Sequence, residues 1–288
     1  MRSKLFVPGS RPELFAKALA GEADAISIDL EDSVIESRKT EARAHVVEFL
    51  NSAEVLCTSK VIIVRCNALR TEHFDADIKA IARPGLGLVN VPKVESADDV
   101  CFAAEAMNQA EVNNKVAEPA GILATIESPA GVRRAARIGA AHSRIVGLQL
   151  GLNDLFDSLN IDRRDAANVH AAMFAVRLAA GEAGVFVLDG AFTDISDEQG
   201  FRAEADMARR LGFEGKSCIH PSQIALANEA FMPSDNEIAA ALEVIKESRL
   251  AEEQGLGAFK VGGKMIDRPS IRRAEKLAAT SRRLRGEQ

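Results

Sequence analysis

Charged residues recur in this chain directly after short apolar runs, and their types suit catalysis or metal binding. The residues concerned are Asp29, Glu31, Asp32, Arg65, Lys93, Glu127, Asp154, Asp189 and His220. A charge near the end of a buried strand costs free energy unless it is paired, solvated or bound to a metal ion. The pattern as a whole therefore predicts a polar site that can hold a metal.

Two of these carboxylates are the best candidate metal ligands. Glu127 lies in the segment ATIESPAG and Asp154 in LGLNDLF, after neighbouring apolar runs and without a His or Cys partner. Carboxylates that leave positions for water and substrate oxygens describe the way Mg²⁺ is usually held. The pair therefore predicts a site for a hard divalent cation, Mg²⁺ with Mn²⁺ as the alternative.

Asp29 and Glu31 are expected to line the substrate site, because Asp29 interrupts an otherwise apolar strand. Arg65, in VIIVRCN, suits a substrate carboxylate or oxyanion, since its planar fork donates parallel hydrogen bonds. The competing interpretation is that Arg65 pairs with Asp29 or Glu31 for structural reasons. Lys93 and Asp189 fit a salt bridge within the fold as well as a role in the site.

The elements that must position these residues alternate between strand and helix. Eight short apolar runs are typical of buried parallel strands, at residues 5–7, 25–30, 61–66, 86–91, 121–126, 145–150, 185–188 and 217–219. Segments with helical spacing lie between them, at residues 36–50, 96–109, 129–138, 165–183 and 197–211. Ser10 to Glu13 predicts a capping box, Ser96 predicts an N-cap, and His220 is expected to order a strand-to-helix turn.

Eight such units predict an α/β fold, a (β/α)₈ TIM barrel, with its site at the C-terminal ends of the strands. After residue 231 the pattern changes to a helix at 236–253, a Gly-rich hairpin at 255–268 and a helix at 269–285. We therefore expect a catalytic barrel domain at residues 1–231. Residues 232–288 are expected to form a helical extension and lid that packs on the barrel or on a neighbouring subunit.

The composition excludes several other classes. The 288-residue chain has a net charge of −6, which argues against a nucleic-acid surface. No apolar run approaches the roughly 20 residues of a membrane span. The four cysteines form no C-x-x-C pair, and Cys66 and Cys218 lie within strand-like segments, which predicts buried, reduced thiols. Without a signal-peptide pattern at the N-terminus, a cytoplasmic location is expected.

Taken in order, these segments resemble the HpcH/HpaI aldolase and citrate-lyase β-subunit family, in particular its CitE-like branch of CoA-ester lyases. The resemblance covers nearly the whole chain. Its carriers are RSKLFVPGSRPELFAKA, DAISIDLEDSV, IVRCN, VPKVES, IESPAGV, LGLNDL, LGFEGKSCIHPSQ and GAFKVGGKMIDRP. One departure is Gly262, where family members often carry an acid, and this puts the chemistry of the lid in doubt.

The resemblance implies a role for several residues. Glu127 and Asp154 would bind Mg²⁺, and Arg65 would contact the substrate near its reacting carbonyl. Asp267 would be a catalytic acid or base that one subunit supplies to its neighbour, which implies a homo-oligomer, typically a trimer. The other implied contacts are those of backbone N–H groups with a keto-acid carboxylate, at Gly151, Leu152 and Asn153, and those of side chains with CoA phosphates, at Arg11 and Lys17.

The implied activity is Mg²⁺-dependent cleavage of a carbon–carbon bond in a 3-hydroxyacyl-CoA, as in an oxo-acid lyase. Citramalyl-, malyl- or citryl-CoA would give a 2-keto acid and an acyl-CoA such as acetyl-CoA. The alternatives are a malyl-CoA-type thioesterase, a CoA-independent class II pyruvate aldolase and a non-enzymatic scaffold subunit. The last is disfavoured because Arg65, Glu127, Asp154 and Asp267 are all intact.

Overall fold

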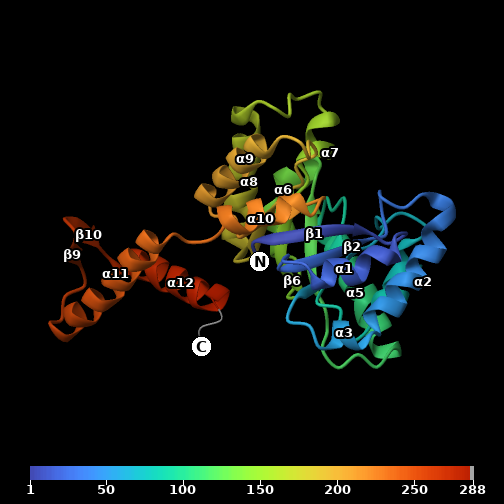
Figure 1. Ribbon diagram of the computed structural model, residues 1–288, viewed down its shortest axis with the longest axis horizontal. Helices are drawn as coiled ribbons and strands as arrows, with labels where there is room; N and C mark the ends of the chain where they lie inside the picture. Colours follow the sequence, from blue (N-terminus) through green and yellow to red (C-terminus); the bar gives the residue numbers. More distant parts are fainter. Residues whose placement is uncertain (286–288) are drawn as a thin grey trace. The chain divides into compact units, whose positions relative to one another are not determined.

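Eight parallel strands close into a barrel in the order of the sequence, which confirms the predicted fold (Figure 1). The computed structural model describes residues 1–285. By its internal contacts the chain divides into two units, Met1–Phe231 and Met232–Gln288. The strands are β1 Ser3–Pro8, β2 Ala25–Asp29, β3 Val61–Arg65, β4 Leu88–Val91, β5 Gly121–Ile126, β6 Ile145–Leu150, β7 Phe186–Asp189 and β8 Gly215–Cys218.

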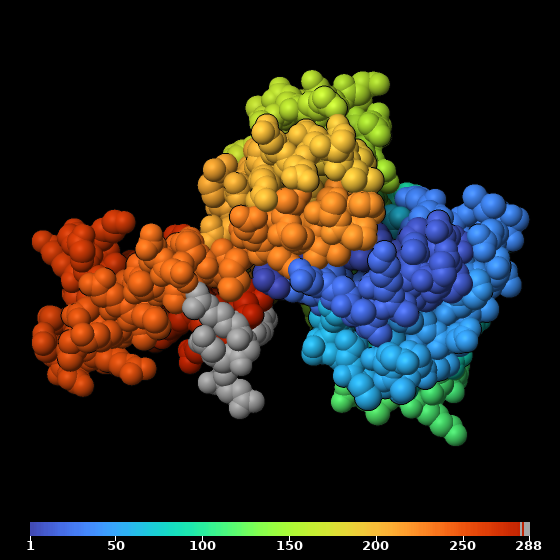
Figure 2. Space-filling model, in the orientation of Figure 1, coloured from blue at the N-terminus to red at the C-terminus, as the bar shows by residue number. Residues whose placement is uncertain are grey.

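The barrel closes where its first strand meets its last. Lys4 of β1 lies opposite Ser217 of β8 in a parallel pairing. The side chain of Ser3 also donates a 2.7 Å hydrogen bond to Asn228 in the helix that follows β8. Figure 2 shows the same closure at the surface, where the first residues (blue) adjoin this helix (orange). Both ends of the unit are therefore held together.

Helices cover the outside of the barrel (Figure 1). They are η1 Pro12–Leu14, α1 Phe15–Ala20, η2 Glu36–Arg38, α2 Lys39–Leu50, α3 Ala53–Leu56, α4 Phe74–Ile81, α5 Ala97–Asn113, α6 Pro129–Gly139, α7 Leu152–Asp157, α8 Ala166–Ala183, α9 Glu198–Leu211 and α10 Ser222–Ala230. Among residues 1–285, no helix is both long and apolar enough to cross a membrane.

The two predicted helix starts had different outcomes. Ser96 caps α5 by accepting a hydrogen bond from the Asp99 N–H at 3.1 Å, as predicted. The predicted capping box at Ser10 to Glu13 is wrong. A 3₁₀ turn begins there after Arg11 without a side-chain cap, because the Glu13 carboxylate pairs with the Arg11 guanidinium instead of a backbone N–H.

The two faces of each strand have different surroundings. Outward aliphatic side chains such as Val64 join the main core beneath the helices. Inside the barrel, the strands supply a small apolar cluster of Ala25, Ile63, Leu88, Leu123 and Leu188. Beyond that cluster the interior turns polar. Lys4, fully buried, donates to Asn90 at 3.3 Å and also to Gln149.

A second set of buried charges ties β7 and β8 to α9. The Lys216 ammonium donates to Asp189 at 2.5 Å and to Glu204 at 2.7 Å, and Glu204 also accepts two bonds from Arg163. Burial alone would raise the pKa of Glu204, but Lys216 and Arg163 hold it below its ordinary value. The sequence left two roles open for Asp189, a salt bridge within the fold or a place in the site. The structure shows the salt bridge, with Lys216.

The second unit is a helical hairpin with a small sheet. Helices α11 Asp235–Glu253 and α12 Arg268–Arg285 flank an antiparallel pair, β9 Phe259–Val261 and β10 Lys264–Ile266. The connection is a two-residue turn in which Gly262 and Gly263 have φ of 53° and 79°. Such a turn needs left-handed backbone at both positions, which accounts for glycine at 262 in structural terms.

Replacing Lys216 with Met should lower the free energy of unfolding by about 3–5 kcal/mol, because Asp189 and Glu204 would stay buried without their shared cation. Urea unfolding measures this. The matched control is Arg202→Ala, which removes an exposed 2.6 Å ion pair between α9 and Glu229. It should leave unfolding nearly unchanged. Similar losses of unfolding free energy in the two variants would show that the buried network stabilises the fold no more than a surface ion pair does.

Candidate active site

Arg65 and Asp29 form the central ion pair at the C-terminal ends of β2 and β3. They lie opposite each other in the parallel pairing, and Arg65 donates two hydrogen bonds to the carboxylate, at 2.7 and 2.8 Å. Burial would raise the pKa of Asp29, but the Arg65 guanidinium holds it below its ordinary value. Both groups therefore remain charged.

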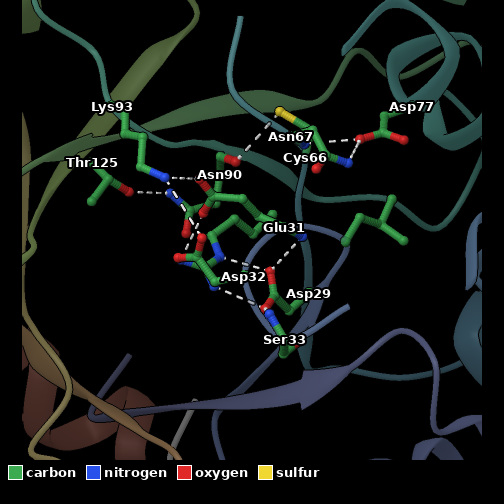
Figure 3. A network of polar contacts seen from close by, with 12 residues as sticks. Asp29, Glu31, Asp32, Ser33, Cys66, Asn67, Asp77, Asn90, Lys93 and Thr125 are labelled. Carbon is green, nitrogen blue, oxygen red and sulfur yellow. Dashed lines mark hydrogen bonds and ion pairs between the residues drawn. The ribbon is translucent and has the colours of Figure 1, made fainter. Parts of the chain in front are cut away.

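The Asp29 carboxylate also shapes the loop that follows β2. It accepts backbone hydrogen bonds from Glu31 at 2.9 Å and from Ser33 at 3.0 Å, as Figure 3 shows. This turn directs Glu31 and Asp32 back to Arg65, whose Nη1 lies 2.9 Å from Glu31 and 3.3 Å from Asp32. One guanidinium thus meets three carboxylates. The ion pairs of Arg65 with Asp29 and Glu31, which the competing structural interpretation predicted, are therefore present.

Lys93 connects this cluster to Glu127. Its backbone N–H donates to Glu127 at 2.7 Å. Its ammonium donates to Glu31 at 2.8 Å, as Figure 3 shows. Lys93 has a φ of 54°, the left-handed region that non-glycine residues seldom adopt. Strained backbone of this kind gathers at functional sites. Lys93 therefore forms a salt bridge and also lies at the mouth of the barrel.

Glu127 and Asp154 line one cavity of about 400 Å³, together with the half-exposed Lys93. Glu127 follows β5 directly, whereas Asp154 lies in the first turn of α7. Burial, followed by the negative charges of Glu31 and Asp154, raises the pKa of Glu127 to about 7. The carboxylates therefore repel one another, and a divalent cation between Glu127 and Asp154 would offset this repulsion. Oxygen donors in such a cluster fit Mg²⁺.

Gly151 gives Glu127 its space. A Cβ atom at position 151 would lie 2.5 Å from the Cβ of Glu127 and 2.7 Å from its Oε2, closer than atoms can approach. The Gly151 N–H donates to the Ile126 carbonyl at 2.9 Å. This N–H is therefore engaged by the barrel. The N–H groups of Leu152 and Asn153 lie in the first turn of α7, where a helix offers no backbone acceptor for them.

Other predicted residues lie outside this cluster. Arg11 and Lys17 are exposed beside η1 and in α1. His220 accepts a hydrogen bond from the Ser222 backbone at 3.2 Å and so orders the turn before α10, as expected. Asp267 belongs to the second unit, where it accepts bonds from the backbone and hydroxyl of Ser270 at the start of α12.

Three buried residues support the site and were not singled out in the sequence. They are Lys39, Asn67 and Asp77, which form a hydrogen-bonded chain behind the loops that follow β2 and β3. Lys39 falls in a polar stretch, where a lysine is normally solvated. Its only sequence signal is a basic residue in the first turn of a helix, where the helix dipole disfavours a cation.

The barrel carries two neighbouring carboxylates and an ion-paired arginine at the C-terminal ends of its strands. This combination is typical of a metal-dependent (β/α)₈ barrel enzyme. Comparison with known proteins is more specific. The chain belongs to the HpcH/HpaI aldolase/citrate lyase family, whose model matches residues 2–221.

Curated relatives of the chain include subunits of citrate lyase and malyl-CoA lyases. The chain is 36% identical over 275 residues to the citrate lyase subunit beta of Escherichia coli K12, covering 95% of this chain and 90% of the relative. It is 35% identical over 296 residues to an L-malyl-CoA/beta-methylmalyl-CoA lyase of Cereibacter sphaeroides, covering 95% and 92%.

A solved structure is similar over the same extent. The protein CitE of Mycobacterium tuberculosis, in complex with magnesium, acetoacetate and coenzyme A, matches with a TM-score of 0.76 and 32% identity. The match covers 98% of this chain and 99% of that chain. The likeness therefore extends over both units of the sequence.

Gly151→Ala should lower kcat/KM by about 100-fold, because the new methyl group displaces the Glu127 carboxylate from its place beside Asp154. Steady-state kinetics measure the loss. The control is Gly181→Ala on the exposed side of α8, where the nearest atom is the end of the Arg177 side chain at 3.3 Å. That variant should keep full activity and gain about 0.5–1 kcal/mol of stability. Full activity in Gly151→Ala would remove the steric argument for this site.

Proposed function

We propose that this protein is a Mg²⁺-dependent carbon–carbon lyase that cleaves a 3-hydroxyacyl-CoA into a 2-keto acid and an acyl-CoA. Citramalyl-, malyl- and citryl-CoA are the candidate substrates. Family membership and the lyases among its relatives support the class of reaction. The single observation that carries the proposal is the neighbouring placement of the Arg65 guanidinium and the Glu127 and Asp154 carboxylates at the barrel mouth, joined through Glu31 and Lys93.

Glu127 and Asp154 are the proposed ligands of Mg²⁺, which Mn²⁺ could replace. Bound there, the metal supplies a Lewis acid for the oxygen atoms of the keto-acid half of the substrate. Glu127 is already oriented for this role by the Lys93 N–H, which donates to one of its oxygens at 2.7 Å. The N–H groups of Leu152 and Asn153 would receive the substrate carboxylate and fix its direction.

Arg65 would stabilise the charge that develops during cleavage. In this direction the hydroxyl releases its proton to solvent water and its oxygen becomes the keto oxygen. The electron pair of the broken carbon–carbon bond passes to the thioester as an enolate, which is protonated afterwards. A fixed cation placed where charge develops lowers the barrier without reorganisation. Because Asp29 holds Arg65 in a bidentate pair, the guanidinium is oriented before the substrate arrives.

The remaining assignments concern CoA and the second unit. Arg11 and Lys17 are exposed cations that could meet the CoA phosphates, although Arg11 would first have to leave Glu13. We assign Asp267 as the acid that protonates the enolate, supplied by a neighbouring subunit of a homo-oligomer, such as a trimer. The four free cysteines fit the reducing conditions of a cytoplasmic location.

The direct test is an assay of the purified protein with the three hydroxyacyl-CoA esters and, separately, with a hydroxy-keto acid without CoA, each with and without EDTA. Keto acid and free CoA thiol are measured separately. The proposal predicts keto acid formation without free thiol, and its loss in EDTA. Free thiol without keto acid would indicate a thioesterase, and cleavage of a hydroxy-keto acid without CoA would indicate an aldolase. Either result in place of the predicted one would overturn the proposal.

Arg65→Lys should lower kcat by about 100-fold with little change in folding, because a point charge cannot reproduce the planar fork. Arg2→Lys is a matched control. Arg2 also binds an aspartate through Nε and Nη2, at 3.1 and 2.8 Å from Asp24, but it lies at the opposite end of the barrel. The control should keep its kcat. If circular dichroism shows Arg65→Lys to be unfolded, Arg65 is chiefly structural.

Asp267 gives a separate test of subunit sharing. As an N-cap, Asp267 would affect stability when replaced and leave kcat unchanged; as a catalytic acid it would do the reverse. Asp267→Ala and Glu127→Gln should each be inactive. A mixture of the two should regain part of the activity, because a mixed oligomer contains sites assembled from two intact halves. No recovery after demonstrated subunit exchange would contradict a shared site.

A further inference from the structure

We propose that Lys39 is a positioning residue of the active site, which joins the loop after β2, where Glu31 lies, to the loop after β3, next to Arg65, through one buried ammonium. The inference rests on the proposed function for its kinetic consequence, but its structural part is independent. Lys39 is the first residue of α2 and is only 9% exposed. It does not lie among the candidate catalytic groups, so its effect would pass through their placement.

The ammonium of Lys39 has a full set of hydrogen bonds. It donates to the carbonyls of Leu30 and Glu31 at 3.0 Å each and to the side-chain carbonyl of Asn67 at 2.6 Å. The first two acceptors belong to the loop after β2, and the third follows β3. A lysine has three donors on one atom, so a single residue can connect both loops.

Two energetic costs show that this lysine is not an ordinary surface residue. Burying an ammonium removes its hydration, and its three acceptors are neutral, so ion pairing with them does not offset that loss. A cation in the first turn of a helix also opposes the helix dipole. Solvation and helix stability would both favour another residue at position 39. The contacts with the two loops account for the lysine.

Asn67 is itself held in one orientation. Its backbone N–H and its side-chain amide both donate to the same oxygen of Asp77, at 2.8 and 2.6 Å (Figure 3). The other oxygen of Asp77 accepts from Arg43 at 2.9 Å. With its amide NH₂ fixed on Asp77, Asn67 must present its carbonyl oxygen to Lys39. The chain therefore transmits rigidity from α2 and α4 to the loops of the site.

The consequence for the site follows from Glu31. Its carboxylate must meet Arg65 at 2.9 Å and Lys93 at 2.8 Å at the same time, from a loop whose backbone carbonyls are bound to Lys39. Without the ammonium, the loop after β2 is released on the side facing α2. Glu31 and Arg65 would then lose their mutual placement, while Glu127 and Asp154 would keep theirs. The rate should therefore suffer more than metal or CoA binding.

Lys39→Met tests this proposal, with Lys60→Met as a matched control. The Lys60 ammonium also links backbone carbonyls, those of Gly21 and Ala23 at 2.6 Å each, but near the N-terminal ends of the strands. Hydrogen exchange followed by mass spectrometry should show faster exchange at residues 30–33 and 66–68 only in Lys39→Met. In the same variant kcat should fall about 10–100-fold, with KM for the acyl-CoA and Mn²⁺ affinity within about twofold of the wild type. Lys60→Met should keep its kcat.

Asn67→Ala is a second variant that leaves Lys39 and its bonds to the loop after β2 in place, and removes the side-chain bonds of Asn67 to Lys39 and to Asp77. It should show a smaller fall in kcat and faster exchange at residues 66–68. If Lys39→Met does not fold, this variant decides the question. Unchanged exchange and kcat in the folded variants would overturn the proposal. A wild-type protein without lyase activity would instead reject the proposed function, and the exchange data would still test the role of Lys39.

Discussion

The bidentate pair between Arg65 and Asp29 is the interaction on which the rest of the barrel mouth depends. Asp29 and Arg65 lie opposite each other in the pairing of β2 and β3. Their charges can be buried because they form an ion pair with two hydrogen bonds. Asp29 uses its remaining capacity to turn the following loop, through the N–H groups of Glu31 and Ser33. Strand pairing, loop conformation and the direction of the guanidinium are therefore set together.

This arrangement leaves negative charge in excess near the cavity. Arg65 and Lys93 are shared among Asp29, Glu31 and Asp32, so that little positive charge remains for Glu127. Burial and the neighbouring carboxylates accordingly raise its pKa to about 7. A divalent cation would offset these charges in addition to its chemical role. Repulsion among these carboxylates costs free energy when no metal is bound. The same repulsion would favour binding of a divalent cation at this site.

Sequence patterns predicted the barrel because most of its strands contain a short apolar run, and the ends of these runs could be read directly. They predicted the charged residues at the mouth for the same reason. Several features could not be predicted. The short helices α4, α7 and α10 lack enough turns to show a period. The role of Asp189 depends on Lys216, whose aliphatic stem and charge give no sign of complete burial. Lys39 acts through the backbone carbonyls of Leu30 and Glu31, which leave no mark in the sequence.

The central claim is that the carboxylates of Glu127 and Asp154 form a cation site at the mouth of this barrel. Titration of the metal-free protein with Mn²⁺, followed by electron paramagnetic resonance without substrate, tests it most directly. The account predicts one bound ion per chain in the wild type and severely weakened binding in both Glu127→Gln and Asp154→Asn, with each variant still folded. Undiminished binding in these variants, or no binding to the folded wild type, would contradict the account.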